Sequence, residues 1–171
     1  MKPVVSIIMG STSDLPVMEK ALNFLEQMEI PFEVNALSAH RTPHQVLAFA
    51  EGAKERGIKV IIAAAGGAAH LPGVIAAATT LPVIGVPIKA SISMDGWDSM
   101  LSMIQMPPGI PVATVGMDAA QNAAILALQI LAVADEEAAK KIADYKAGLE
   151  KKIEKANKEL AAKKDWKFKT N

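Results

Sequence analysis

The chain has 171 residues, is 51% hydrophobic, and balances 18 lysine and arginine side chains against 18 aspartates and glutamates. This length and apolar content predict one domain with a full core, and the even charge excludes a global field that would attract nucleic acid or an anionic membrane. Because cysteine is absent, disulfides, thiolate nucleophiles and Cys-ligated zinc are excluded. No signal-peptide pattern or membrane-length apolar run is present, so we expect a soluble cytoplasmic protein without a membrane partner.

Short apolar runs alternate with longer helical patterns along the chain. The runs predict buried strands at 4–9, 32–37, 60–64, 83–86 and 112–115. The helical patterns cover about 14–28, 43–55, 71–79, 96–104 and 119–133. This alternation predicts an α/β fold, with a parallel sheet between two layers of helices.

Polar and small residues gather at four of the predicted strand-to-helix junctions. These junctions are residues 10–14 (Gly-Ser-Thr-Ser-Asp), 38–41 (Ser-Ala-His-Arg), 66–70 (Gly-Gly-Ala-Ala-His) and 89–95. In parallel sheets ligands bind beyond the carboxyl ends of the strands. We therefore expect all four junctions to meet at one edge of the sheet and to form the site there.

The second junction combines a proton carrier with a fixed cation. His40 and Arg41 precede Thr42, which we expect to cap the next helix with Pro43 at its first position and Gln45 completing a capping box. The helix N-terminus attracts anions, arginine holds phosphate in fixed geometry, and histidine transfers protons near neutral pH. This segment predicts chemistry on a phosphorylated molecule.

The first and third junctions each have a plainer alternative. Hydroxyls and backbone N–H groups at 10–14 allow close approach of a ligand; the alternative is that Ser13 or Asp14 serves only as a helix cap. The small residues at 66–69 leave room for a flat ring, although close packing of helix on strand explains them equally, without explaining His70. The three histidines lack metal-ligand spacing, so we expect no metal site.

The region after the predicted sheet has a different composition. Residues 136–164 are rich in lysine and glutamate, with apolar residues at helical spacing: Ile142, Tyr145, Leu149, Ile153, Ala156 and Leu160. This pattern predicts a long one-sided helix whose stripe is covered either by another subunit or by its own domain. We thus expect a single catalytic domain over 1–171, made of a core (1–134), the helix (135–164) and a tail (165–171) that Trp166 and Phe168 can anchor.

Four ordered motifs carry a family resemblance: Met-Gly-Ser-Thr-Ser-Asp, Ser-Ala-His-Arg-Thr-Pro, Ala-Gly-Gly-Ala-Ala-His-Leu-Pro-Gly, and Asp-Ser-Met-Leu-Ser-Met-Ile-Gln-Met-Pro-Pro-Gly-Ile-Pro-Val-Ala-Thr. Over about residues 4–132 the chain resembles class I PurE, the N5-carboxyaminoimidazole ribonucleotide mutases of purine (IMP) biosynthesis. The resemblance implies a flavodoxin-like three-layer αβα sandwich, a homo-octamer with active sites at subunit contacts, and no cofactor. The chain departs from the family pattern in two places: the segment 116–124 is shorter than the common family form, and the lysine-rich tail differs.

The resemblance also implies the site and its reaction. His40 would be the general acid and base, and the residues that bind the nucleotide substrate would be Ser11, Ser13, Asp14, Ser38, Arg41, Gly66, Gly67, Ala68, His70 and Leu71. The implied isomerase reaction moves a carboxylate from the exocyclic nitrogen to ring carbon 4 through decarboxylation and recarboxylation. Three alternatives remain. They are a class II-type carboxylase that uses free carbon dioxide, a flavodoxin-like module that binds FMN without catalysis, and a structural or regulatory oligomer whose site has decayed.

Overall fold

A computed structural model describes residues 2–163 of the chain. One sheet contains five strands, β1 (Val5–Met9), β2 (Phe32–Ala36), β3 (Val60–Gly66), β4 (Val83–Ile88) and β5 (Ala113–Thr114). The strands are ordered β2-β1-β3-β4-β5, and each neighbouring pair is parallel. This is the flavodoxin-like order, in which chain direction across the sheet reverses beside β1.

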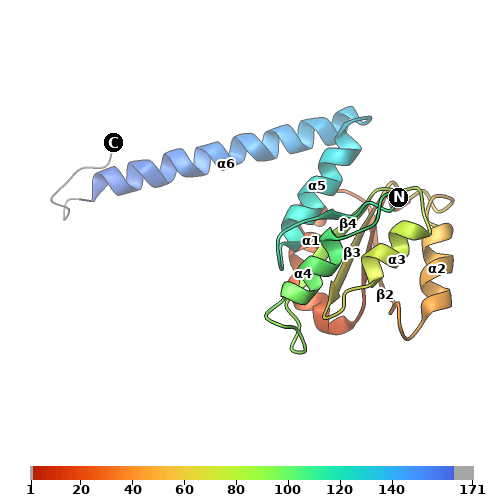
Figure 1. Cartoon of the computed structure of the whole chain (residues 1–171). Helices are drawn as coiled ribbons and strands as arrows, with labels where there is room; N and C mark the ends of the chain where they lie inside the picture. Colours follow the sequence, from red (N-terminus) through yellow and green to blue (C-terminus); the bar gives the residue numbers. More distant parts are fainter. Residues whose placement is uncertain (1, 164–171) are drawn as a thin grey trace.

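Residues 2–163 form six α-helices and one short 3-10 helix, η1 (Thr12–Asp14); the first five α-helices lie around the sheet, and the sixth extends away from it (Figure 1). The α-helices are α1 (Leu15–Gln27), α2 (Pro43–Glu51), α3 (Leu71–Ala77), α4 (Trp97–Ile104), α5 (Ala120–Ala132) and α6 (Glu136–Ala162). One buried cluster joins the sheet to α1 and α5, and a second joins its other face to α2, α3 and α4. The predicted three-layer αβα sandwich with a long C-terminal helix is confirmed.

The central strands are apolar throughout because both of their faces are covered. On β1, Ile7 belongs to the cluster under α1 and α5, and Ile8 to the cluster under α2, α3 and α4. On β3, Ile61 and Ile62 divide in the same way. Successive side chains of a strand point to opposite faces, so an unbroken apolar run supplies both cores at once.

Several predicted boundaries differ from the structure. β3 and β4 continue to Gly66 and Ile88, two residues beyond the predicted ends, because their neighbours continue the ladder there. The helix predicted to reach residue 55 ends at Glu51, and the chain turns after Gly52, a weak helix former, to Gly57 at φ 97°. The last predicted strand shortens to Ala113–Thr114 at the sheet edge, where the ladder with β4 has only two pairs, Ile84 with Ala113 and Gly85 with Thr114.

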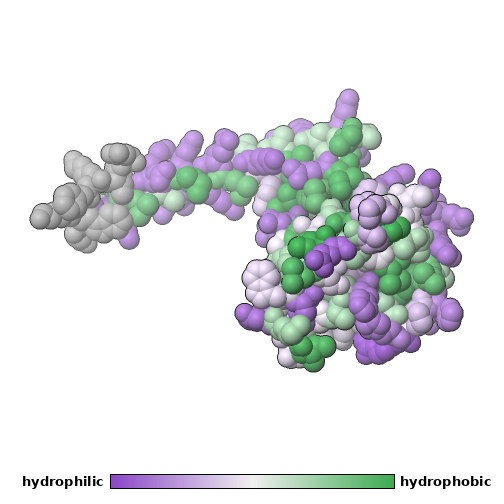
Figure 2. All heavy atoms as spheres, in the orientation of Figure 1, coloured by the Kyte–Doolittle hydropathy of each residue, from purple (hydrophilic) through white to green (hydrophobic). Residues whose placement is uncertain are grey.

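The long helix α6 divides into a packed base and a projecting distal half (Figure 1). Asp135 caps it by accepting a hydrogen bond from the Ala138 N–H (3.0 Å), and Tyr145 packs edge-on against Phe24 of α1 with ring centroids 5.1 Å apart. Beyond this base, Leu149 and Ile153 are 41% and 65% exposed, and Figure 2 shows green apolar patches among purple polar side chains along α6. Its own domain therefore covers only the base of the stripe.

Two further expectations concern the remaining chain. The anchoring residues Trp166 and Phe168 lie outside the described residues. Within residues 2–163, no helix has the length and apolar character needed to cross a membrane.

Candidate active site

A pocket of about 310 Å³ lies at the carboxyl edge of the sheet. All four predicted junctions contribute to its lining, which comprises Gly10, Ser11, Ser13, Asp14, Ser38, Ala39, His40, Arg41, Ala65, Gly66, Ala69, His70, Leu71, Ala90 and Ile92. It opens beside β1 and β3, where the strand order reverses. The expectation that the four junctions converge at one edge is confirmed.

His40 and His70 come from different junctions and make direct contact. His40 Nε2 lies 2.7 Å from His70 Nδ1, and the two rings are almost perpendicular at 89°. One of these nitrogens must donate a proton and the other must accept it, so the contact is incompatible with two fully protonated rings. Both rings are exposed to the pocket opening, and the pair can exchange a proton with a ligand bound there.

The turn before α2, which carries His40 and Arg41, is stabilised by hydrogen bonds other than those of the predicted capping box. Thr42 precedes the helix and Pro43 begins it, as expected, but the Thr42 side chain caps nothing. Its hydroxyl instead accepts from the Ser38 N–H (3.0 Å) and donates to the Ser38 carbonyl (3.1 Å). The capping-box prediction was wrong because the hydroxyl closes the 38–42 turn, which fixes the loop that carries His40.

Arg41 links the first two junctions. Its Nη2 donates to the Gly10 carbonyl at 2.9 Å, while its backbone N–H donates to Ser38 Oγ at 3.2 Å. A guanidinium has five N–H donors, so this anchored and exposed side chain keeps donors for an anion. The arrangement sets a positive charge above the 10–14 loop.

The first junction presents a buried carboxyl group. Ser11, and not Ser13 or Asp14, is the capping residue here, because its Oγ accepts the Ser13 N–H (3.3 Å) at the start of η1. Asp14 stands before α1 without a side-chain capping bond and is only 5% exposed. Burial raises the pKa of its carboxyl above the ordinary value, and a hydrogen bond from Ser13 Oγ (3.3 Å) opposes that rise. A carboxyl not used for capping can accept ligand hydroxyls.

Only some residues of the third junction line the pocket. Gly66, His70 and Leu71 line the pocket, whereas the predicted Gly67 and Ala68 do not. The Gly67 N–H donates to Ser93 Oγ (3.2 Å), and the Ala68 carbonyl accepts from Ser102 Oγ (2.8 Å). These two residues tie the loop to the fourth junction and α4.

Close packing also explains one of the glycines. A Cβ on Gly66 would lie 2.6 Å from Ala90 Cβ, and Gly67 has φ +60°. The packing explanation for the small residues is thus correct at Gly66, and the loop conformation favours glycine at position 67.

Six pocket residues were not among the predicted site residues: Gly10, Ala39, Ala65, Ala69, Ala90 and Ile92. The alanines carry no chemical signal, since a methyl group is common in any core. Ile92 is 82% exposed, and an isoleucine between polar residues of a junction is a signal that could have identified it. Lys89 forms an ion pair with Asp95 in the same segment, which raises the pKa of Lys89.

No cluster of three His, Asp or Glu side chains suited to a metal ion occurs among residues 2–163.

Comparison with known proteins identifies the family. The sequence profile of AIR carboxylase matches residues 4–152, which is most of the chain. The chain belongs to the AIR carboxylase family. It is 55% identical over 159 residues to the N5-carboxyaminoimidazole ribonucleotide mutase of Pyrococcus horikoshii, covering 93% of this chain and 89% of that protein.

Two other relatives agree with this placement. The N5-carboxyaminoimidazole ribonucleotide mutase of Thermotoga maritima is 53% identical over 157 residues, covering 91% of each chain. A crystal structure of a Treponema denticola PurE2 variant superposes with a TM-score of 0.83 at 30% identity, covering 94% of this chain and 99% of that one. The resemblance read from the four motifs is confirmed at the level of the family.

Proposed function

We propose that this protein is an isomerase of de novo purine biosynthesis that converts N5-carboxyaminoimidazole ribonucleotide to 4-carboxy-5-aminoimidazole ribonucleotide. Relatives at 53–55% identity over most of the chain carry the name of this mutase. The observation in the structure that carries the proposal is the His40–His70 contact beside Arg41 in one pocket. This arrangement combines proton transfer with anion binding, which carboxylate migration on a phosphorylated nucleotide requires.

Substrate binding divides among the junctions. Arg41 and the hydroxyls of Ser11 and Ser13 bind the phosphate, since a guanidinium and short hydroxyls suit its oxygens. Asp14 accepts a ribose hydroxyl, which agrees with its buried carboxyl free of capping duty. The aminoimidazole ring lies along the small residues Gly66 and Ala69, with room that larger side chains would remove.

The chemistry needs one proton delivered and one removed. His40 donates a proton to the exocyclic nitrogen that bears the carboxylate; the carbon–nitrogen bond then breaks, and carbon dioxide and the neutral aminoimidazole form. Ring carbon 4 attacks the retained carbon dioxide, and the new carbon–carbon bond takes its electrons from the ring. His40 then removes the proton from carbon 4, which restores aromaticity and the starting protonation state.

His70 assists this cycle by holding His40. The 2.7 Å contact fixes the ring of His40 and provides an alternative location for its proton. Within residues 2–163, His70 is the one side chain that hydrogen-bonds to the His40 ring, so a rotated His40 would lose this orientation. We assign His70 a positioning role, and we keep Leu71, which also lines the pocket, among the residues that bind the substrate.

We also propose a homo-octamer in the cytoplasm, with a second copy closing the site. Apolar side chains near the fourth junction support this, since Ile92, Met94, Trp97, Leu101 and Ile104 are between 46% and 82% exposed. An exposed apolar surface of this kind marks a contact with another protein.

One assay tests the function. Purified protein is incubated with N5-carboxyaminoimidazole ribonucleotide without ATP, and separately with aminoimidazole ribonucleotide and bicarbonate. Saturable isomerisation of the first substrate is expected; turnover of the second alone would favour the class II-type carboxylase. A yellow protein with bound flavin and no turnover of either substrate would favour the FMN-binding alternative.

A further inference from the structure

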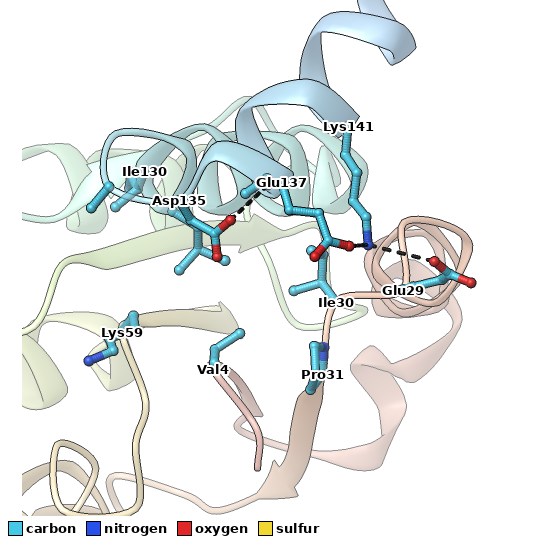
Figure 3. A pocket seen from close by; sticks show the side chains of 12 residues that line it. Val4, Glu29, Ile30, Pro31, Lys59, Ile130, Asp135, Glu137 and Lys141 are labelled. Atoms are coloured by element: carbon cyan, nitrogen blue, oxygen red, sulfur yellow. Dashed lines mark hydrogen bonds and ion pairs between the residues drawn. The ribbon is translucent and has the colours of Figure 1, made fainter. Parts of the chain in front are cut away.

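A larger cavity, of about 850 Å³, lies at the opposite edge of the sheet from the candidate active site, between the junction of α5 with α6 and the residues that precede β1, β2 and β3 (Figure 3). Its lining includes no residue of the four junctions. At its rim, Lys141 pairs with Glu29 (3.6 Å) and with Glu137 (3.1 Å). The two imidazoles in contact lie instead at the smaller cavity, and the 66–70 loop, which carries His70, decides whether they meet.

The 66–70 loop has an uncommon backbone conformation. Gly67 has φ +60°, and Ala69, which is not a glycine, has φ 50°. A non-glycine residue in the left-handed region is strained, and such a conformation persists where surrounding contacts hold it. One bond closes the loop on itself, from the Ala69 N–H to the Gly66 carbonyl (3.2 Å). The loop that ends at His70 therefore relies on contacts from outside to keep this shape.

Ser93, in the fourth junction, supplies the contact at Gly67. Its Oγ accepts two backbone N–H groups, from Gly67 at 3.2 Å and from Ala90 at 3.1 Å. The bond with Ala90 is local and closes a turn, together with the Ser93 N–H, which donates to the Ala90 carbonyl (3.0 Å). The bond with Gly67 spans 26 residues of the chain and closes no turn. Ser93 thus fixes the loop of one junction to a turn of another.

Packing and a second hydroxyl reinforce this contact. A Cβ on Gly67 would lie 3.1 Å from Ile92 Cδ1, so the two loops touch where glycine leaves room. Ser102 of α4 donates from its Oγ to the Ala68 carbonyl at 2.8 Å. Ala68 is exposed, so water can replace that partner, whereas Gly67 is buried and its N–H depends on Ser93.

We propose that Ser93 is a positioning residue of the active site, which holds the 66–70 loop so that His70 meets His40. The inference rests on the proposed function, in which His40 transfers the protons and His70 orients it. Without the Ser93 hydroxyl, the buried Gly67 N–H loses its acceptor, and the loop relaxes to reach another one. His70 then leaves the 2.7 Å contact with His40. Ser93 acts through the loop, since it does not itself line the pocket.

Steady-state kinetics with N5-carboxyaminoimidazole ribonucleotide provides the first test. Ser93→Ala removes the hydroxyl and hardly changes the volume, so we expect kcat to fall by up to about 10²-fold, the loss that a displacement of about 1 Å can cause. KM should change little, because the proposed function assigns phosphate and ribose binding to Arg41 and the 10–14 loop. Ser93→Thr retains the hydroxyl and should restore most of the wild-type kcat. An unchanged kcat in folded Ser93→Ala overturns the proposal.

Two other serines serve as controls. Ser91→Ala changes an exposed residue of the same segment that does not line the pocket, and it should leave kcat and Tm unchanged. Ser99→Ala removes a buried hydroxyl that donates to the Ile88 and Gly96 carbonyls (3.1 and 2.9 Å), neither of which belongs to the third junction. It should lower Tm and leave kcat unchanged. A fall of kcat in Ser99→Ala as large as in Ser93→Ala would mean that any weakening of this region slows the enzyme, and would overturn the proposal.

Nuclear magnetic resonance tests the contact without turnover. The chain has three histidines, so the ring protons of His40 and His70 can be assigned from single replacements in protein that is deuterated except at histidine. An Overhauser effect between the two rings is expected in the wild type and in Ser91→Ala, and it should be lost in Ser93→Ala. Its persistence in Ser93→Ala overturns the proposal. A wild type that shows the Overhauser effect without mutase turnover would overturn the proposed function, while the comparison with Ser93→Ala still decides the role of Ser93.

Discussion

Replacement of His40 tests the proposed reaction at the residue to which the proposal assigns both proton transfers. His40→Asn removes the proton carrier and leaves a polar side chain of smaller volume in an exposed loop. The 38–42 turn depends on Ser38 and Thr42 and not on the imidazole, so the loop should keep its shape. We therefore expect loss of turnover without loss of folding or of substrate binding.

The magnitude follows from the role of the ring. General acid–base catalysis contributes roughly 10²–10⁴-fold, which corresponds to about 2.7–5.4 kcal/mol of barrier. Since the proposed mechanism uses His40 in two proton transfers, we expect kcat to fall toward or beyond the upper end of that range. The dissociation constant of the nucleotide should change little, because the proposal assigns phosphate and ribose binding to Arg41 and the 10–14 loop.

The measurement pairs single-turnover kinetics with isothermal titration calorimetry. His44→Asn is the matched control, because His44 is an exposed histidine four residues away that does not line the pocket. It should retain wild-type turnover. A His40→Asn enzyme that isomerises its substrate at close to the wild-type rate would refute the assignment of His40 as acid and base.

Three further predictions concern other parts of the site. Arg41→Ala should weaken nucleotide binding by about 1.5–3 kcal/mol, the loss of a charge-assisted hydrogen bond, and unchanged affinity in calorimetry would move the phosphate elsewhere. Asp14→Asn should stabilise the protein at neutral pH while weakening nucleotide binding. Burial raises the pKa of Asp14 in the folded state, so the protonated carboxyl contributes to stability at low pH. This contribution is lost as pH rises through the raised pKa, and the neutral asparagine avoids that loss. Thermal unfolding of Asp14→Asn and the wild type across pH 3–7 checks this. A stability difference in favour of Asp14→Asn that grows toward low pH would contradict it. Gly66→Ala should lower the free energy of unfolding in urea by about 1–3 kcal/mol, because the added Cβ overpacks against Ala90. Gly10→Ala, with nothing within 4 Å of the added Cβ, should lower it less. Equal losses would refute the steric argument.

The sequence by itself determined the fold class and the general position of the site. The apolar runs at β1, β3 and β4 predicted buried strands because side chains of alternating direction must fill two cores. The order of strands and helices along the chain required parallel connections, and these bring the carboxyl ends of the strands to one edge. His40, Arg41, Asp14 and His70 could be named as candidates because their chemistry is visible in the residue type.

Only the tertiary structure decided which of these groups meet and what their hydrogen bonds are used for. The contact of His40 with His70 joins residues 30 apart in the chain, and local pattern contains no information on that distance. The Thr42 hydroxyl had two competing partners, and the turn that includes Ser38 determined which one it took. Ala90 and Ile92 became pocket residues through the close approach of two loops at Gly66, because long-range packing, and not residue type, sets which backbones touch.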